Sequence, residues 1–168
     1  MSMIGNLVRV SEEELNLFLI DSSKLEDVIF NDEENPNLLD LDKTWDGLLY
    51  ILTGYTIEQV EKAEPPLKWV VFGDYIIDED QDLGYGPADY RTPAQVSEVN
   101  EAIKNITADD FRTMLLNSDL KMRSDIYPGI LWPEGEEAFD YHFEYFQRVQ
   151  AFYSLAAQNN EAVISFIN

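Results

Sequence analysis

The sequence predicts an α/β fold: a mixed β-sheet with helices on both faces, in a helix-rich three-layer α/β/α sandwich. Segments 3–10 and 162–167, at the two ends of the chain, are short apolar runs rich in β-branched residues, which is the pattern of buried strands. Helical patterns fill most of the chain between them. A sheet in such a chain is covered on both sides. Because 168 residues are the length of one ordinary domain, we expect residues 1–168 to form a single domain.

Several of the expected helices carry a start signal. In a capping box, a Ser or Thr side chain accepts a hydrogen bond from the backbone three residues later, and the acidic or amide side chain there reaches back. The sequence places such pairs after Ser11, Ser23, Thr56, Thr92 and Thr107. We expect the first of these helices to span 12–20.

One amphipathic helix is expected to begin after Asp42, which would cap it, and to end at Gly54. Its apolar residues recur at i, i+3, i+4 and i+7, so they share one buried face. These residues are Trp45, Leu48, Leu49 and Leu52.

The longest helix is expected over 134–158, where acidic residues in the first turn complement the helix dipole. It is apolar around much of its circumference, which is typical of a helix packed against a sheet and other helices. Its buried side should carry Phe139, Phe143 and Phe146, with His142 among them as a core histidine.

The remaining segments are expected to be shorter or irregular. Residues 31–40 are polar, contain a proline and predict a loop. Segment 67–72 favours a short helix over a buried strand. Segments 83–92 and 126–132 should be extended, each bent by Gly and Pro residues.

Charge is the most unusual property of the chain. The sequence has 33 acidic residues against 11 Lys and Arg, a formal net charge of −22. Such a surface repels nucleic-acid phosphates and anionic lipids, so we expect no binding to nucleic acid or to a membrane. A basic protein or a cation is the better partner, although a solvated surface that keeps the protein soluble also explains the charge. The chain shows neither a signal peptide nor an apolar span, so we expect a cytoplasmic location.

Common catalytic machinery has little support in the sequence. There is no cysteine, which excludes disulfides and thiolate chemistry, and His142 is the only histidine. Nucleophile-elbow, zinc-protease, P-loop and dinucleotide motifs do not occur. We therefore expect a protein that is not an enzyme and that carries no cofactor.

Five blocks of the sequence match a family pattern. They are Met3-Ile4-Gly5, Leu41-Asp42-Lys43-Thr44-Trp45-Asp46, Leu52-Thr53-Gly54, Gly84-Tyr85-Gly86-Pro87-Ala88 with Tyr90, and Ile126-Tyr127-Pro128-Gly129. In these blocks the sequence resembles the YfbM-like family, small bacterial proteins of unknown function. The resemblance implies a three-layer α/β/α fold in the bacterial cytoplasm and one YfbM-like domain over residues 1–168, and it implies no activity.

An acidic loop has part of the spacing of a calcium-binding loop. Asp78, Asp80 and Asp82 alternate, and Asp89 follows eleven residues after the first. The glycine is displaced, the last ligand is Asp instead of Glu, and Pro87 intrudes. A solvated acidic loop without a metal is the favoured interpretation.

Five residues could form a ligand pocket around the expected helix start: Lys43, Trp45, Asp46, Arg91 and Tyr127. The aromatic residues would form walls, and a cation would meet an anionic ligand. The competing interpretation is structural, with Trp45 in the core and the charged residues exposed.

Two functions follow. The leading one is a non-enzymatic binding protein with a basic protein partner. The alternative is a small-molecule-binding or hydrolytic protein with a pocket at Lys43, Trp45 and Asp46.

Overall fold

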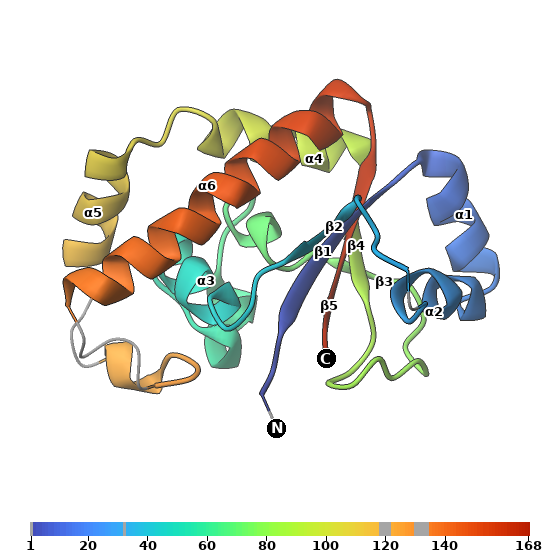
Figure 1. Cartoon of the computed structure of the whole chain (residues 1–168), viewed down its shortest axis with the longest axis horizontal. Coiled ribbons are helices and arrows are strands. Elements are labelled where there is room, and N and C mark those ends of the chain that lie inside the picture. The colour runs from blue at the N-terminus through green and yellow to red at the C-terminus, as the bar shows by residue number, and fades with distance from the viewer. Residues whose placement is uncertain (1, 32, 118–121, 130–134) are drawn as a thin grey trace.

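The computed structural model describes residues 2–31, 33–117, 122–129 and 135–168. These residues form a five-stranded sheet with strand order β2-β1-β5-β4-β3, with helices on both of its faces (Figure 1). The strands are β1 (Gly5–Val10), β2 (Leu38–Asp40), β3 (Tyr75–Ile76), β4 (Asp89–Arg91) and β5 (Ala162–Ile167). The predicted α/β class, with its three layers, is confirmed.

The two ends of the chain pair at the centre of the sheet. Strand β1 lies antiparallel to β5 over six residue pairs, from Gly5 opposite Ile167 to Val10 opposite Ala162. Both predicted terminal strands are therefore confirmed. Because these strands are covered on both faces, nearly every residue in them is buried, which explains their continuous apolar composition.

The prediction of a mixed sheet was wrong in one respect, since all four strand pairs are antiparallel. The direction of a strand depends on the end of the sheet from which the chain returns after each helix. No local sequence pattern predicts which end this is. The edge strands β2 and β3 were also missed: β2 lies in the segment 31–40 that was expected to be a loop, and no element was predicted at β3. Strands of two or three residues are defined by pairing with a neighbour more than by their own composition.

The two faces of the sheet are covered by different sets of helices (Figure 1). The first pair, α1 (Glu12–Ile20) and α2 (Ser23–Ile29), packs on one face. The other face carries α3 (Trp45–Thr53), α4 (Pro93–Ile103), α5 (Ala108–Leu116) and α6 (Glu136–Gln158). Three short 3-10 helices complete the described structure: η1 (Ile57–Lys62), η2 (Lys68–Val70) and η3 (Met122–Asp125).

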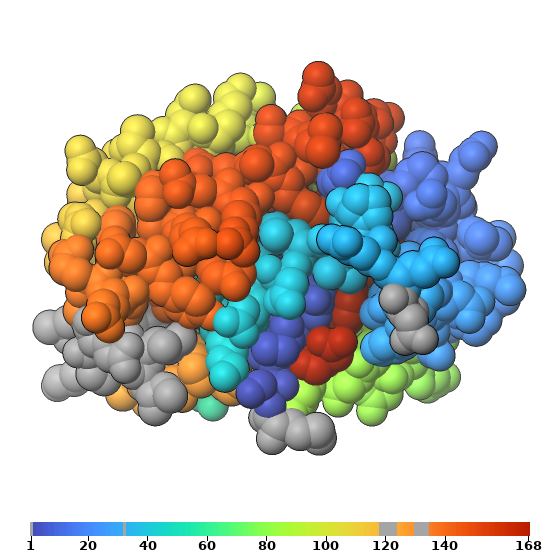
Figure 2. Space-filling view, viewed as in Figure 1, coloured from blue at the N-terminus to red at the C-terminus, as the bar shows by residue number. Residues whose placement is uncertain are grey.

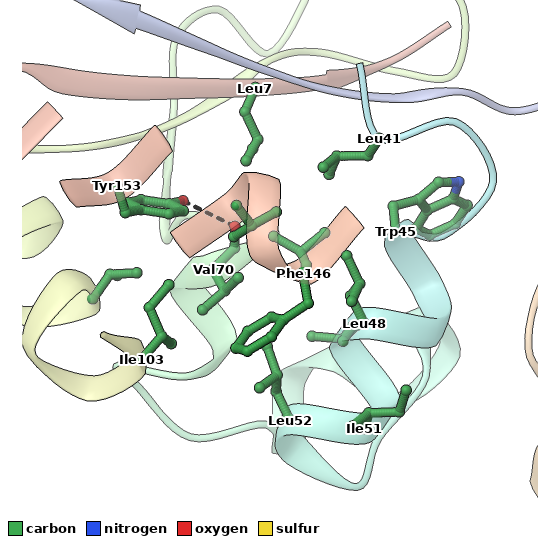
Figure 3. Close-up of a cluster of buried hydrophobic side chains, with 14 of the residues drawn as sticks. Leu7, Leu41, Trp45, Leu48, Ile51, Leu52, Val70, Ile103, Phe146 and Tyr153 are labelled. Atoms are coloured by element: carbon green, nitrogen blue, oxygen red, sulfur yellow. Dashed lines mark hydrogen bonds between the residues drawn. The ribbon is translucent and has the colours of Figure 1, made fainter. Parts of the chain in front are cut away.

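The larger core lies under α3 to α6. Leu7 and Val163 face it from the sheet, and Phe146 of α6 and Trp45 of α3 fill it (Figure 3). Tyr153 brings its hydroxyl into this core, where it donates to the carbonyl oxygen of Val70 at 2.9 Å. Burying that hydroxyl costs little because it has an acceptor.

The smaller core lies under α1 and α2. Val8 in β1 and Ile164 in β5 are each next in sequence to a residue that faces the larger core. Each of these strands therefore contributes side chains to both cores. Leu15, Phe18 and Leu25 cover them from the two short helices. The sheet thus separates two apolar cores of unequal size.

Most of the predicted helix starts agree with the structure. Ser11 accepts from the Glu14 amide at 3.1 Å, and complete capping boxes form at Thr92 and Thr107. Ser23 does not cap α2; its amide and hydroxyl both donate to the side chain of Asp21. Thr56 precedes η1 without a side-chain cap bond.

The predicted cap of α3 was wrong. Asp42 lies two residues before the N-cap position, in a left-handed turn at φ 49°, and its carboxylate accepts from the hydroxyl of Tyr141. Thr44 occupies the N-cap position instead and donates its hydroxyl to the Leu41 carbonyl at 2.6 Å. The helix therefore begins three residues after Asp42, at Trp45.

The long helix agrees with its prediction over the described residues. It begins at Glu136 and ends at Gln158, and position 134 lies outside the described residues. Phe139 and Phe146 are buried, whereas Phe143 is only partly buried. His142 is 1% exposed and its Nδ1 lies 2.8 Å from the Ala138 carbonyl, as expected for a core histidine.

Three irregular segments were predicted with mixed success. Segment 67–72 contains η2, so the choice of helix was correct. Segment 83–92 contains β4. Residues 126–129 form a turn where an extended segment was expected, and 130–132 lie outside the described residues. In the described part of the chain, no helix is long and apolar enough to cross a membrane.

Candidate functional site

The start of α3 gathers three of the five predicted pocket residues. Trp45 stacks on Tyr127 with ring centroids 5.5 Å apart. The indole Nε1 donates to the Met3 carbonyl at 3.1 Å, and the Tyr127 hydroxyl accepts from the Met3 amide at 2.8 Å. A Cβ on Gly5 would lie 2.6 Å from the Trp45 Cβ, so the first strand needs glycine there. The two rings therefore fix the N-terminal segment against α3.

Asp46 joins three segments through backbone amides. Its carboxylate is 1% exposed and accepts from the Ile57 amide at 2.8 Å and the Tyr127 amide at 2.9 Å. Burial raises the pKa of Asp46, and the two amide hydrogen bonds oppose that shift. Both carboxylate oxygens thus have backbone donors, which ties α3 to η1 and to the 126–129 turn.

An open cavity of about 320 Å³ lies beside this cluster. Asp46 and Tyr127 contribute to its wall from one side, and Glu58 and Asp125 add further carboxylates. The full lining is Met3, Asp46, Ile57, Glu58, Ser124, Asp125, Ile126, Tyr127, Pro128 and Gly129. Lys43 and Arg91 are not among these residues.

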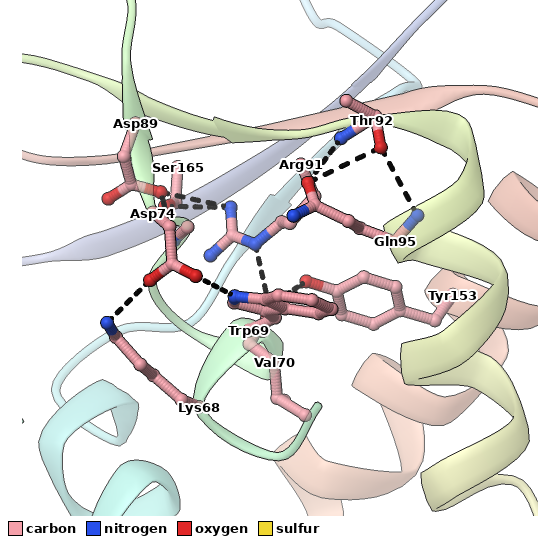
Figure 4. A network of polar contacts seen from close by, with 11 residues as sticks. Lys68, Trp69, Val70, Asp74, Asp89, Arg91, Thr92, Gln95, Tyr153 and Ser165 are labelled. Atoms are coloured by element: carbon pink, nitrogen blue, oxygen red, sulfur yellow. Dashed lines mark hydrogen bonds and ion pairs between the residues drawn. The ribbon is translucent and has the colours of Figure 1, made fainter. Parts of the chain in front are cut away.

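The two predicted cations lie elsewhere. Lys43 is half-buried in the turn before α3 and forms no ion pair with another described residue. Arg91 is fully buried in β4. Its Nε donates to the Trp69 carbonyl at 2.6 Å and its Nη1 to the Ser165 hydroxyl at 2.9 Å (Figure 4). None of these contacts involves Trp45, Asp46 or Tyr127.

Arg91 belongs to a polar network between the sheet and η2 (Figure 4). Its guanidinium lies 3.2 Å from the Asp89 carboxylate, which also accepts from the Gly73 amide at 2.6 Å. Burial raises the pKa of Asp89 and Arg91 opposes that shift. On the outer side, Asp74 accepts from Lys68 at 2.6 Å and from the Trp69 indole at 2.7 Å. The network holds β4 against η2.

The carboxylates of the calcium-like loop do not converge. Asp78 accepts from the Ser22 hydroxyl at 2.6 Å and from the Asp80 amide at 3.0 Å. Asp82 accepts from the amides of Gly84 and Gly86, and Asp89 turns inward to Arg91. These hydrogen bonds lower the pKa of Asp78 and of Asp82. Within the ranges that the structure describes, no group of three or more acidic or histidine side chains could hold a metal ion.

A surface that sequence reasoning missed lies over the smaller core. We call it the acidic–apolar face and define it as segments 11–37 and 73–87. In sequence, these segments hold nine and five acidic residues respectively, and Lys24 is their only basic residue. They also carry seven of the nine large apolar side chains that are exposed in the described structure. Those seven are Leu17, Leu19, Ile20, Phe30, Tyr75, Ile76 and Tyr85.

Direct contacts hold the two segments of the acidic–apolar face together. The Ser22 hydroxyl donates to Asp78, and the Gln81 side chain donates to the Ser22 carbonyl at 2.9 Å and to Glu26 at 3.0 Å. In the space-filling view, the blue side chains of α1 and α2 and the green side chains below them form one end of the molecule (Figure 2). These contacts join α1 and α2 to residues 78–81, whereas Ile76 lies opposite Asp89 in the β3–β4 pair and is directed to the η2 side of the sheet.

A groove of about 480 Å³ opens between α1 and α2 on this face. Its walls are three residues from each helix, and its floor is the β1 strand. The full lining is Val8, Arg9, Val10, Glu14, Leu17, Phe18, Lys24, Asp27, Val28, Asn35 and Asn37.

One signal in the sequence could have found the acidic–apolar face. Helix 12–20 has five large apolar residues, of which Leu15 and Phe18 suffice to cover the sheet. Leu17, Leu19 and Ile20 then point elsewhere, and Ile20 is 85% exposed. A short helix that is apolar on more than one side needs a second partner.

Fold and surface together define a small, acidic α/β protein with a large core on one side of its sheet and an exposed acidic–apolar layer on the other. The chain belongs to the family described as "Domain of unknown function (DUF1877)", whose model matches residues 1–166. The predicted YfbM-like resemblance is thereby confirmed.

Two comparisons support this membership. The curated protein "Protein YfbM" of Escherichia coli (strain K12) is 28% identical over 136 residues, which cover 80% of this chain and 78% of that protein. The crystal structure of YfbM from Escherichia coli, described there as a protein of unknown function, matches with a TM-score of 0.73 at 18% identity. It covers 98% of this chain and 99% of that one, so the two share a fold.

Proposed function

We propose that this is a non-enzymatic binding protein of the bacterial cytoplasm whose partner is a basic protein, and that the partner docks on the acidic–apolar face. The observation that carries the proposal is the coincidence of charge and exposed apolar surface. Fourteen of the 33 acidic residues and seven of the nine exposed large apolar side chains lie in the same two segments.

The exposed apolar side chains and the acidic side chains each have a physical role in association. Exposed apolar patches rimmed by polar residues mark interaction sites, because burying them in a complex removes apolar surface from water. Carboxylates around such a patch steer a basic partner toward it and reject acidic ones. The same charge supports the expectation that nucleic acids and anionic membranes do not bind.

A matched pair of variants tests the proposal. In Leu19→Ser/Ile20→Ser the acidic–apolar face loses two exposed apolar side chains of α1, and in Leu116→Ser/Leu155→Ser two such side chains are lost elsewhere. Each protein is incubated with a lysate of the bacterium that encodes it, cross-linked and analysed by mass spectrometry. We expect a basic protein that cross-links to segments 11–37 or 73–87 of the wild type and of the Leu116/Leu155 double variant, and is lost with the Leu19/Ile20 double variant.

Equal retention by the two double variants would refute the proposed docking face. A captured partner with an acidic isoelectric point would refute the proposed chemistry. Binding should also weaken steeply between 50 and 500 mM salt, since exposed charges are screened over about 10 Å at 0.1 M salt and 3 Å at 1 M.

A small-molecule function has one observation in its favour. The buried Asp46 contributes to the wall of the 320 Å³ cavity, and cavities of this size are typical of ligand sites. The lining carries three carboxylates, so the ligand would be cationic instead of the anionic one first expected. Screening cationic metabolites by thermal shift, with Glu58→Gln as the control, tests this alternative.

A further inference from the structure

The groove between α1 and α2 has walls of regular geometry. Glu14, Leu17 and Phe18 of α1 follow the spacing i, i+3, i+4, and so do Lys24, Asp27 and Val28 of α2. Residues at that spacing form one stripe along a helix. Each helix therefore presents one stripe to the groove.

The groove is apolar at its base and charged at its rim. Val8 and Val10 lie 1% and 3% exposed at the base, and Phe18 is 3% exposed beside them. Leu17 is 48% exposed on the upper wall. Glu14 and Asp27, both exposed, stand on opposite walls. An apolar side chain would be buried at the base while basic neighbours reach the rim.

The charges around the groove favour one sign of ligand. Arg9 lines it but is already paired, because its Nη1 donates to both oxygens of Glu161 and its Nη2 to Asn37. Lys24 is the one cation of the lining that has no ion pair with a described residue. Its positive charge partly offsets the charges of Glu14 and Asp27. Segment 11–37 nevertheless has nine acidic residues, so the groove favours a cationic ligand.

We propose that the groove between α1 and α2 binds a basic amphipathic helix of the partner, which inserts apolar side chains between Leu17 and Val28 and places Lys or Arg beside Glu14 and Asp27. The inference rests on the proposed function and narrows it to a helix-in-groove contact. Each wall stripe spans five residues, which are four steps of 1.5 Å or about 6 Å of helix, so the groove receives one to two turns of the partner.

The probe is a synthetic peptide of about 16 residues built from Leu and Lys, with leucines at i, i+3, i+4 and i+7. A control peptide has the same composition with the leucines distributed around the helix. Binding is measured by fluorescence anisotropy at about 150 mM salt, where non-specific charge attraction is reduced. We expect the amphipathic peptide to bind at least 10-fold tighter than the control peptide.

Two variants with the same charge change separate the groove from the rest of the surface. Leu17→Lys alters the groove wall, and Leu155→Lys alters α6 at similar exposure, 48% against 42%. We expect at least 10-fold weaker peptide binding for the first and less than 3-fold for the second. Lys24→Gln removes the opposing cation, so it should tighten binding by about 2-fold to 5-fold.

The outcomes distinguish the two proposals. Equal effects of Leu17→Lys and Leu155→Lys on the peptide would overturn the groove assignment. If Leu17→Lys also leaves the captured partner bound while Leu19→Ser/Ile20→Ser releases it, the docking face stands without the groove. Partner binding that survives every one of these variants would overturn both. Thermal melting of each variant checks that it is folded.

Discussion

The two faces of the sheet differ in how they are covered, although the same strands serve both. Among the described residues, 23 buried apolar residues form the core under α3 to α6 and 11 form the core under α1 and α2. The larger core is closed by a 23-residue helix, whereas the smaller one is covered by helices of nine and seven residues. We call the layer of α1 and α2 the thin layer and the layer of α3 to α6 the thick layer. The thin layer leaves large apolar side chains exposed to water, whereas the thick layer buries nearly all of its large apolar side chains.

This asymmetry separates stability from binding. The larger core removes more apolar surface from water, so most of the free energy of unfolding should reside there. The thin layer contributes less, because part of the apolar surface of its side chains stays in water in the isolated chain. A layer of that kind can be reserved for a partner without weakening the fold.

The largest expected effect is in the thick layer. Phe146 is fully buried and stacks on Phe111 with ring centroids 4.8 Å apart. Phe146→Ala removes an aromatic side chain from a close-packed site and should lower the free energy of unfolding by about 3–5 kcal/mol. Urea denaturation measures the loss. A loss below about 1 kcal/mol would mean that the long helix contributes little to stability.

A leucine in each layer allows a direct comparison. Leu25 of α2 and Leu48 of α3 are both fully buried. Leu→Ala costs about 2–5 kcal/mol, and the cost is lower where neighbours can collapse into the space. We expect Leu25→Ala to cost about 2–3 kcal/mol and Leu48→Ala to cost more, in the same urea assay. Equal costs would show that the thin layer is packed as rigidly as the thick one.

The sequence predicted individual helices and strands better than the contacts between them. Strand 162–167, helix 12–20 and the long helix are marked by composition, caps and periodicity, and they appear where expected. The strand directions and the edge strands were not predictable, because both depend on contacts between segments that are distant in sequence. A two-residue strand such as β3 has too few residues to show a pattern.

The candidate site shows the same limit. Trp45 and Asp46 are neighbours in sequence, and the structure adds Tyr127 to them across 81 residues through a backbone amide. Arg91 donates hydrogen bonds to Trp69 and Ser165 instead. Strand β4 pairs with β5, which places the Arg91 side chain on the side of the sheet that η2 covers. The sequence could not predict that the Asp46 carboxylate accepts hydrogen bonds from two backbone amides, because every residue except proline has such an amide and no residue type marks the donor.

The single histidine gives the thick layer a pH dependence. Burial lowers the pKa of His142 from 6.5 to about 4. Below pH 6.5 the unfolded chain therefore binds a proton that the folded chain does not, so the free energy of unfolding falls as the pH falls from 7 toward 4. The contribution of His142 between pH 7.5 and pH 5 should be about 2 kcal/mol.

His142→Gln isolates this contribution from that of the carboxylates, because the chain has no other histidine. Urea denaturation at pH 7.5 and pH 5 should show a smaller decrease for the variant than for the wild type, by about 2 kcal/mol. An identical pH dependence in the two proteins would mean that His142 is hydrated and titrates near its ordinary pKa.

The smallest expected effect on stability is in the thin layer, and it sharpens the comparison most. Ile20 ends α1 with its side chain 85% exposed, so Ile20→Ser removes apolar surface that is already in water. The free energy of unfolding should change by less than about 0.5 kcal/mol, as for other surface substitutions, while partner capture is reduced. Urea denaturation and the cross-linking assay are run on the same preparation, with Leu116→Ser, 68% exposed and outside the acidic–apolar face, as the control. A loss of stability above 1 kcal/mol would show that Ile20 is held by the fold in solution, and the asymmetry between the layers would then reflect incomplete packing instead of a surface kept for a partner.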